Sequence, residues 1–355
     1  MTTPRRYDID WIRVIAIALL MVYHAAVGFQ PWGTMIAFIT SEESWESLWV
    51  PMTLLNVWRI PLLFFVSGMG VYFAMQNRTC KQLLAERSKR ILVPYVFGFF
   101  CIVPIHLYLF RSYLDIPQAY TPSPGHLWFL GNIFCYVLIC LPWFVYLKKH
   151  QTSRWMEQLR KGMTTPLGLL PILAMFVGEV LLLRPMPFEF YAMTPHGFFL
   201  GLIGFFSGFY LMLMGDVFWK MIVRWRFLFL LVAAGLFVMR TFWLKFPPAY
   251  GLSIESNMWI LSVFAFGHRY LQRPHRYLSY LSQAAYPVYI LHMVFLYLGS
   301  VFIFPWRMPL PLQFLLLVLV TVGGSLACFE GIRRVRVLRF LFGVEQRSFF
   351  KKQTP

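Results

Sequence analysis

Apolar residues occur along this chain in long runs, separated by short segments that carry most of the charge. An α-helix needs about 20 mainly apolar residues to cross the hydrocarbon core of a bilayer. The pattern therefore predicts an all-α integral membrane protein with about ten transmembrane helices. The predicted spans are 11–32, 53–75, 91–110, 127–147, 166–185, 196–218, 227–244, 253–271, 283–304 and 310–331.

Composition agrees with the run lengths. Hydrophobic residues make up 59% of the chain, charged residues only 13%, and the mean hydropathy is +0.62. A soluble domain carries about 25% charged residues. No loop between the predicted spans is long enough for a second domain, so we expect one transmembrane domain over 1–355 with a short basic tail from about 333.

The distribution of charge predicts which way the helices point. Of the 32 Lys and Arg residues, 25 lie on one side of the predicted spans. Such a bias marks the cytoplasmic side of a membrane protein, and an even number of spans then places both the N- and C-termini there. The net charge of +18 is thus explained by orientation and by contact with the lipid bilayer, and we expect no nucleic-acid partner.

The first span contains two ionisable residues, Arg13 and His24. Eleven residues of helix separate them by about 16 Å along the axis and about three turns, so both project from nearly the same face. Ionisable groups at membrane depth are costly and commonly functional. Two readings stay open: a functional pair, or an Arg13 that reaches the interface with a His24 that bonds between helices.

A second candidate is Arg87 with Arg90, just before the third span. Two arginines three residues apart on one helix face can bind phosphate with their planar forks. The alternative is an ordinary cytoplasmic basic loop.

Three further groups of polar residues lie in or beside apolar spans. They are Ser67 in the second span, His126 with Trp128 at the mouth of the fourth, and Tyr286, Tyr289 and His292 in the ninth. Ser67 either binds substrate or bonds within a small-residue helix crossing. The five cysteines form no CxxC pair, and we expect neither a disulfide framework nor a metal site.

Taken together and in this order, these motifs resemble the membrane acyltransferase 3 family. The resemblance runs from about residue 6 to about residue 345 and rests on Arg13 with His24, Phe64-Phe65-Val-Ser67-Gly68, Arg87-x-x-Arg90-x-x-x-Pro94, His126-Leu-Trp128-Phe129-Leu130 and Tyr286-Pro-Val-Tyr289-x-x-His292. The opening segment and the length look most like the branch that contains the glucan succinyltransferases.

The resemblance implies O-acyl transfer from a cytoplasmic acyl-CoA donor, a co-substrate and not a bound cofactor, to an extracytoplasmic carbohydrate or glucan. It also implies a multi-pass protein of the bacterial inner membrane. His24 matches the essential histidine of the family, and Arg13, Arg87 and Arg90 match its essential arginines.

The spacing of the residues fits this chemistry. Arginines at the cytoplasmic face would hold the phosphates of the donor, and a neutral His24 would act as general base. The acceptor would enter past His126 and Trp128, and Ser67, Tyr289 and His292 are candidates for oxyanion or substrate contacts. A transporter or flippase for a polar solute or lipid-linked glycan is the alternative, because buried Arg and His also line transport paths. A non-catalytic scaffold would leave Arg13 and His24 without a purpose.

Overall fold

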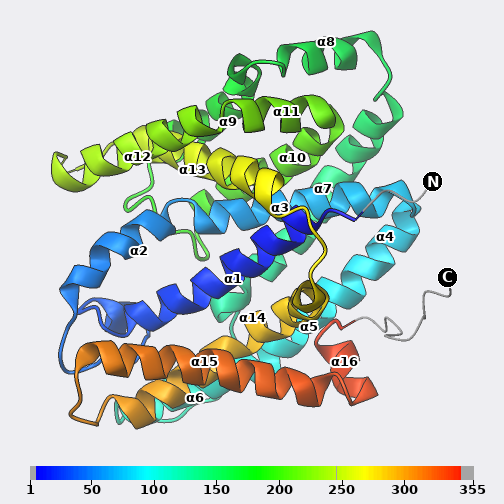
Figure 1. The fold of residues 1–355 in the computed structure, drawn as a ribbon. Coiled ribbons are helices and arrows are strands. Elements are labelled where there is room, and N and C mark those ends of the chain that lie inside the picture. Colours follow the sequence, from blue (N-terminus) through cyan, green and yellow to red (C-terminus); the bar gives the residue numbers. More distant parts are fainter. Residues whose placement is uncertain (1–4, 245, 345–355) are drawn as a thin grey trace.

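The computed structural model describes residues 5–244 and 246–344, and within these ranges every regular element is helical. Most of the long helices lie roughly along one common direction, as Figure 1 shows. The α-helices are α1 (Tyr7–Val27), α2 (Trp49–Asn56), α3 (Arg59–Gln76), α4 (Cys80–Arg87), α5 (Val93–Phe97), α6 (Val103–Tyr113), α7 (Trp128–Lys149), α8 (Arg154–Gly162), α9 (Leu170–Leu183), α10 (Pro195–Met214), α11 (Asp216–Arg224), α12 (Arg226–Phe242), α13 (Ala249–Tyr270), α14 (Arg276–Ile303), α15 (Leu310–Ile332) and α16 (Arg336–Leu341).

The prediction of an all-α membrane protein is confirmed. Among the described residues, eight helical stretches are long and apolar enough to cross a bilayer, and α11 with α12 adds a ninth if that pair, bent by 61°, is one span. α13 forms a 22-residue helix at the position of the eighth predicted span. It is long enough to cross a bilayer but not apolar enough to be counted, and the number of ten spans stays a prediction.

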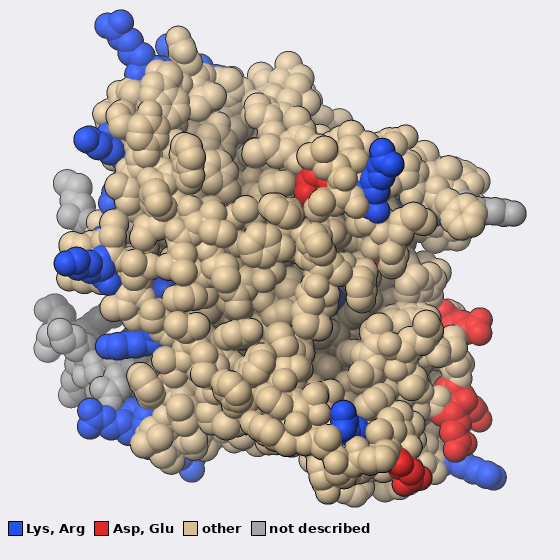
Figure 2. Space-filling view, turned by 180° about the vertical axis from the view of Figure 1, so that it is seen from behind, with Lys and Arg blue, Asp and Glu red and all other residues tan. Residues whose placement is uncertain are grey.

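The two ends of the helix bundle differ in charge. α1 begins at the same end as α4, α8 and α16, and we call this the basic end. Figure 2 shows Lys and Arg concentrated along one edge of the molecule and most of the visible Asp and Glu along the other. The basic tail predicted from residue 333 is described as far as Val344, and its remainder lies outside the described residues.

Helix α1 lies between two groups of helices. α14, α15 and α6 lie on one side of it, and α3 and α13 lie on the other, where they pack with α9 to α12 (Figure 1). α1 contacts α3, α13, α14 and α15 directly. Polar side chains on α1 therefore face neighbours from both groups.

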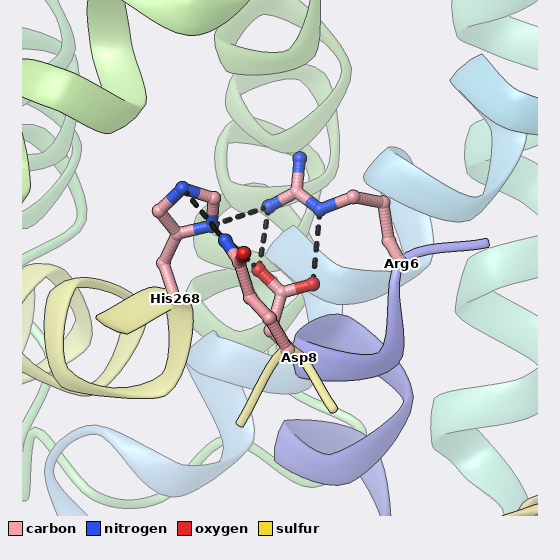
Figure 3. Close-up of polar contacts among 4 residues, drawn as sticks. Arg6, Asp8 and His268 are labelled. Carbon is pink, nitrogen blue, oxygen red and sulfur yellow. Dashed lines mark hydrogen bonds and ion pairs between the residues drawn. The ribbon is translucent and has the colours of Figure 1, made fainter. Parts of the chain in front are cut away.

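A buried carboxylate anchors the N-terminal end of α1, which lies at the basic end of the bundle. Asp8 is fully buried and accepts hydrogen bonds from Arg6 Nε at 2.9 Å and Nη2 at 2.6 Å. His268 Nδ1 of α13 lies 2.8 Å from the same carboxylate, as Figure 3 shows. The Arg6 guanidinium also lies over the Trp219 ring, 4.0 Å from its centroid. These contacts tie the start of α1 to α11 and α13, which fixes the depth and rotation of the helix.

Helices α3 and α10 approach more closely than side chains would allow. A Cβ at Gly68 would lie 1.9 Å from the Phe205 carbonyl oxygen, and one at Gly208 would lie 2.0 Å from the Phe65 carbonyl oxygen. Small residues permit such backbone contact between membrane helices. The pair holds α3 against α10 and so positions the face of α3 that carries Ser67.

Candidate active site

Two arginines from different helices meet near the basic end. Arg87, the last residue of α4, donates from Nη2 to the Gly70 carbonyl oxygen of α3 at 3.1 Å. Arg13 of α1 lies beside the same glycine, since a Cβ at position 70 would lie 3.9 Å from Arg13 Nη2. The structure thus brings together two of the three arginines that the sequence grouped.

Arg90 lies further out than Arg87. Its Nη1 is 3.0 Å from the Glu86 carboxylate, whereas Arg87 Nε is 3.7 Å from it. The Arg90 side chain is 35% exposed and that of Arg87 is 13% exposed. Ser88–Leu92 is a π-helical turn, a local widening of the helix that is frequent at functional sites.

A small cavity of about 20 Å³ leads inward from Arg13. It lies between α1, α3, α7 and α14, with Tyr286 and Tyr289 on α14 and Ser67 on α3 among its lining residues. Apart from Arg13, the lining carries hydroxyl groups and apolar side chains but no charge. The cavity therefore extends from Arg13 past the next turn of α1 to Tyr289.

Beyond the cavity, His24 and His292 form a pair. His24 Nδ1 lies 2.9 Å from His292 Nε2, and the two rings stack with centroids 5.2 Å apart and an interplanar angle of 7°. His292 is fully buried, while His24 is partly exposed. His24 lies about 16 Å beyond Arg13 along α1 by the helix rise. At this depth its hydrogen-bond partner is His292 of α14.

The hydrogen bonds assign a tautomer to each histidine of the neutral pair. His292 Nδ1 lies 2.6 Å from the Tyr289 carbonyl oxygen, which can only accept, so Nδ1 carries the hydrogen. His292 Nε2 is then the acceptor for His24 Nδ1. It follows that His24 carries its hydrogen on Nδ1 and its free lone pair on Nε2, the atom that a general base needs.

Two more histidines extend this pair. The His126 ring meets the His292 ring edge-on at 5.1 Å, and the His106 ring lies 5.4 Å from that of His126. His126 Nε2 donates to the Ile290 carbonyl oxygen at 3.0 Å, and the Tyr289 hydroxyl donates to the His126 carbonyl oxygen. We call His24, His292, His126 and His106 the histidine cluster. His106 was not singled out from the sequence, because a lone histidine in an apolar run has no spacing that marks it.

The other candidates take different places. Ser67 borders the cavity, and its hydroxyl donates to the Leu63 carbonyl oxygen of its own helix at 2.7 Å. Trp128 is 9% exposed and packs against Phe64, with ring centroids 6.1 Å apart. The structure thus places Ser67 beside the route from Arg13 but does not bring Trp128 into the histidine cluster. Among the described residues, no group of three or more His, Cys, Asp or Glu could hold a metal ion.

Sequence reasoning also missed Arg59, the first residue of α3. It is 1% exposed, and its guanidinium lies over the ring of Tyr23, 4.1 Å from the centroid. In the sequence, Arg59 is only one of the few Lys and Arg residues that lie on the side of the predicted spans opposite the basic side. Its position among apolar residues and near a turn was the one available signal.

Comparison with known proteins assigns the class. An acyltransferase domain model matches residues 6–330, so the chain belongs to the acyltransferase 3 family. No curated protein and no solved structure matches it. The protein is therefore a multi-pass membrane acyltransferase.

Proposed function

We propose that this enzyme is an O-acyltransferase that moves a succinyl or acetyl group from a cytoplasmic acyl-CoA to a hydroxyl of an extracytoplasmic carbohydrate, such as a glucan. One arrangement carries the proposal. Arg13 and Arg87 lie side by side near the basic end. In the direction of α1, the cavity follows Arg13, and the pair of His24 with His292 lies beyond the cavity.

The basic end fits the donor. Lys and Arg concentrate on the cytoplasmic side of membrane proteins, and acyl-CoA is a cytoplasmic compound with phosphate groups. Guanidinium groups bind phosphate through paired, charge-assisted hydrogen bonds. Arg13 and Arg87 would hold this part of the donor while its acyl arm extends along the cavity toward His24.

The histidine pair fits the transfer step. The acceptor hydroxyl oxygen bonds to the thioester carbonyl carbon while His24 Nε2 takes the hydroxyl proton. The tetrahedral intermediate then breaks its C–S bond, and the thiolate leaves with the proton that His24 returns. His292 keeps His24 in the required tautomer throughout, because it accepts from His24 Nδ1.

Reconstitution in liposomes tests the proposal. Protein oriented with the basic end outward is given radiolabelled acetyl-CoA or succinyl-CoA outside and a β-glucan oligosaccharide inside. We expect labelled oligosaccharide in the lumen, and a loss of about 10²–10⁴-fold for a folded His24→Ala protein, as for removal of a general base. Passage of unmodified oligosaccharide without acylation would instead identify a transporter, and substantial transfer by His24→Ala would refute the general-base role.

A further inference from the structure

Arg59 is a buried cation without a counter-ion. Its Nε and Nη1 atoms have no hydrogen-bond partner, and no ion pair with it occurs among residues 5–244 and 246–344. Burying an unpaired charge is strongly unfavourable. Arg240, which is also buried, shows the usual arrangement, since its Nε and Nη2 lie 2.5 Å and 3.1 Å from the carboxylate of Glu255.

The position of Arg59 places its charge near the histidine cluster. The Tyr23 ring below the guanidinium belongs to the residue before His24 in α1, and it lies edge-on to the His24 ring with centroids 6.1 Å apart. Arg59 also begins α3 after a break from α2, and the N-terminal end of a helix carries partial positive charge. Both features favour a negative charge at this point.

Three hydrogen-bond donors that the sequence offered for the oxyanion are already engaged. The Ser67 hydroxyl donates to Leu63, the Tyr289 hydroxyl to the His126 carbonyl oxygen, and His292 Nδ1 to the Tyr289 carbonyl oxygen. None of these three groups, all candidates from the sequence for oxyanion contact, has a hydrogen to offer without giving up its present bond. The guanidinium of Arg59 does.

We propose that Arg59 is the catalytic residue that stabilises the oxyanion of acyl transfer, an inference that rests on the proposed function. As the acceptor oxygen bonds to the thioester carbon, the carbonyl π electrons move onto the carbonyl oxygen. Arg59 donates hydrogen bonds to that oxyanion and keeps its own protons. When the carbonyl re-forms and the C–S bond breaks, the negative charge leaves with the thiolate, which takes its proton from His24.

A donor that is unpaired before the reaction suits this role. Preorganised donors stabilise charge that develops in the transition state without any rearrangement. The cost appears in stability, because an unpaired buried cation destabilises the fold. The proposal therefore predicts that removal of Arg59 lowers the reaction rate without lowering the melting temperature. Removal of an arginine that only supports the fold would lower both.

The test compares Arg59→Met and Arg59→Lys with wild type, with Arg111→Met as the matched control. Arg111 also lies outside the basic end and is partly exposed, with its Nη1 bonded to the Pro117 carbonyl oxygen. Transfer to a β-glucan oligosaccharide is measured with acetyl-CoA and with succinyl-CoA, together with the melting temperature of each protein. We expect kcat for Arg59→Met to fall about 10²–10³-fold with both donors, with unchanged donor KM and an unchanged or raised melting temperature.

Arg59→Lys, which keeps the charge without the fork, should fall between Arg59→Met and wild type. A loss confined to succinyl-CoA would overturn the proposal and make Arg59 a site for the acyl carboxylate. Unchanged kcat in Arg59→Met, or a loss of activity that follows a lowered melting temperature in both variants, would also overturn it. Absence of transfer by wild type would refute the proposed function itself, and the role of Arg59 with it.

Discussion

His24 and His292, separated by 268 residues in the chain, share a hydrogen bond of 2.9 Å between nearly parallel rings. The bond joins α1 to α14 beyond the cavity that begins at Arg13 and is lined by Tyr289, three residues before His292. Because His292 donates to a backbone carbonyl through its other nitrogen, its role toward His24 in the neutral pair is that of acceptor. His292 is therefore a positioning residue in the proposed reaction.

This relationship predicts different effects for two substitutions of His292. In His292→Gln, the amide oxygen can still accept from His24 Nδ1, so we expect most of the activity to remain. In His292→Leu, the His24 tautomer is no longer fixed, and kcat should fall by about 100-fold, within the range of general-base effects. The measurement is kcat as a function of pH for both variants. Equal losses in both, with an unaltered pH profile, would show that His292 only fills space.

Donor binding should depend more on Arg87 than on Arg90. Arg87 points inward to Gly70 beside Arg13, whereas Arg90 is more exposed. A phosphate contact from a well-placed guanidinium contributes about 1.5–3 kcal/mol, so Arg87→Ala should raise the donor KM by about tenfold or more, and Arg90→Ala by less. Titration of acyl-CoA at a saturating acceptor concentration gives both values. Unchanged KM in both variants would mean that the two arginines only mark a cytoplasmic basic loop. A larger effect for Arg90 than for Arg87 would contradict the predicted ranking.

The crossing of α3 and α10 should not tolerate a methyl group. In Gly68→Ala the new Cβ would meet the Phe205 carbonyl at 1.9 Å, and overpacking of this kind costs about 1–3 kcal/mol. Gly178→Ala in α9 is the control, because its Cβ would meet nothing within 4 Å and alanine favours a helix over glycine. Melting temperatures in one detergent should fall for Gly68→Ala and stay equal or rise for Gly178→Ala. Equal melting temperatures for the two variants would contradict the close approach.

Sidedness links the fold to the proposed reaction. Ser44 and Thr152 are both exposed; Thr152 lies between α7 and α8, whereas Ser44 precedes α2. In a cysteine-free background, Ser44→Cys should react with an impermeant thiol reagent on intact cells, and Thr152→Cys only after lysis. The opposite labelling pattern would place the basic end outside and remove the donor side proposed here.

The helices could be predicted from the sequence because lipid selects runs of apolar residues whatever their neighbours are. Arg13 and His24 could be assigned to one helix face because α-helical spacing fixes it. Which helix faces them could not be predicted. The contact of His24 with His292, and that of Arg87 with Gly70, depend on how α1, α3, α4 and α14 pack.

The features that were missed or differently placed depend on contacts between helices, which the sequence alone does not fix. Arg59 stands out in the structure because two of its buried nitrogens have no hydrogen-bond partner, and a missing contact leaves no pattern in the sequence beyond the position of the residue among apolar neighbours. Trp128 looked like an interfacial ring, yet the packing of α7 against α3 buries it on Phe64. The reduced apolarity of α13 reflects side chains such as Glu255, whose charge is paired with Arg240 inside the protein.

The cavity between Arg13 and Tyr289 has room for about one water molecule. A space this small does not conduct a stream of hydrated ions, although it extends from Arg13 to Tyr289, whose hydroxyl donates to the His126 carbonyl oxygen in the histidine cluster. An acyl arm that enters must displace side chains and then fills the space it opens. In the proposed reaction, the acyl group would thus pass between two aqueous compartments while the membrane around the enzyme stays electrically insulated.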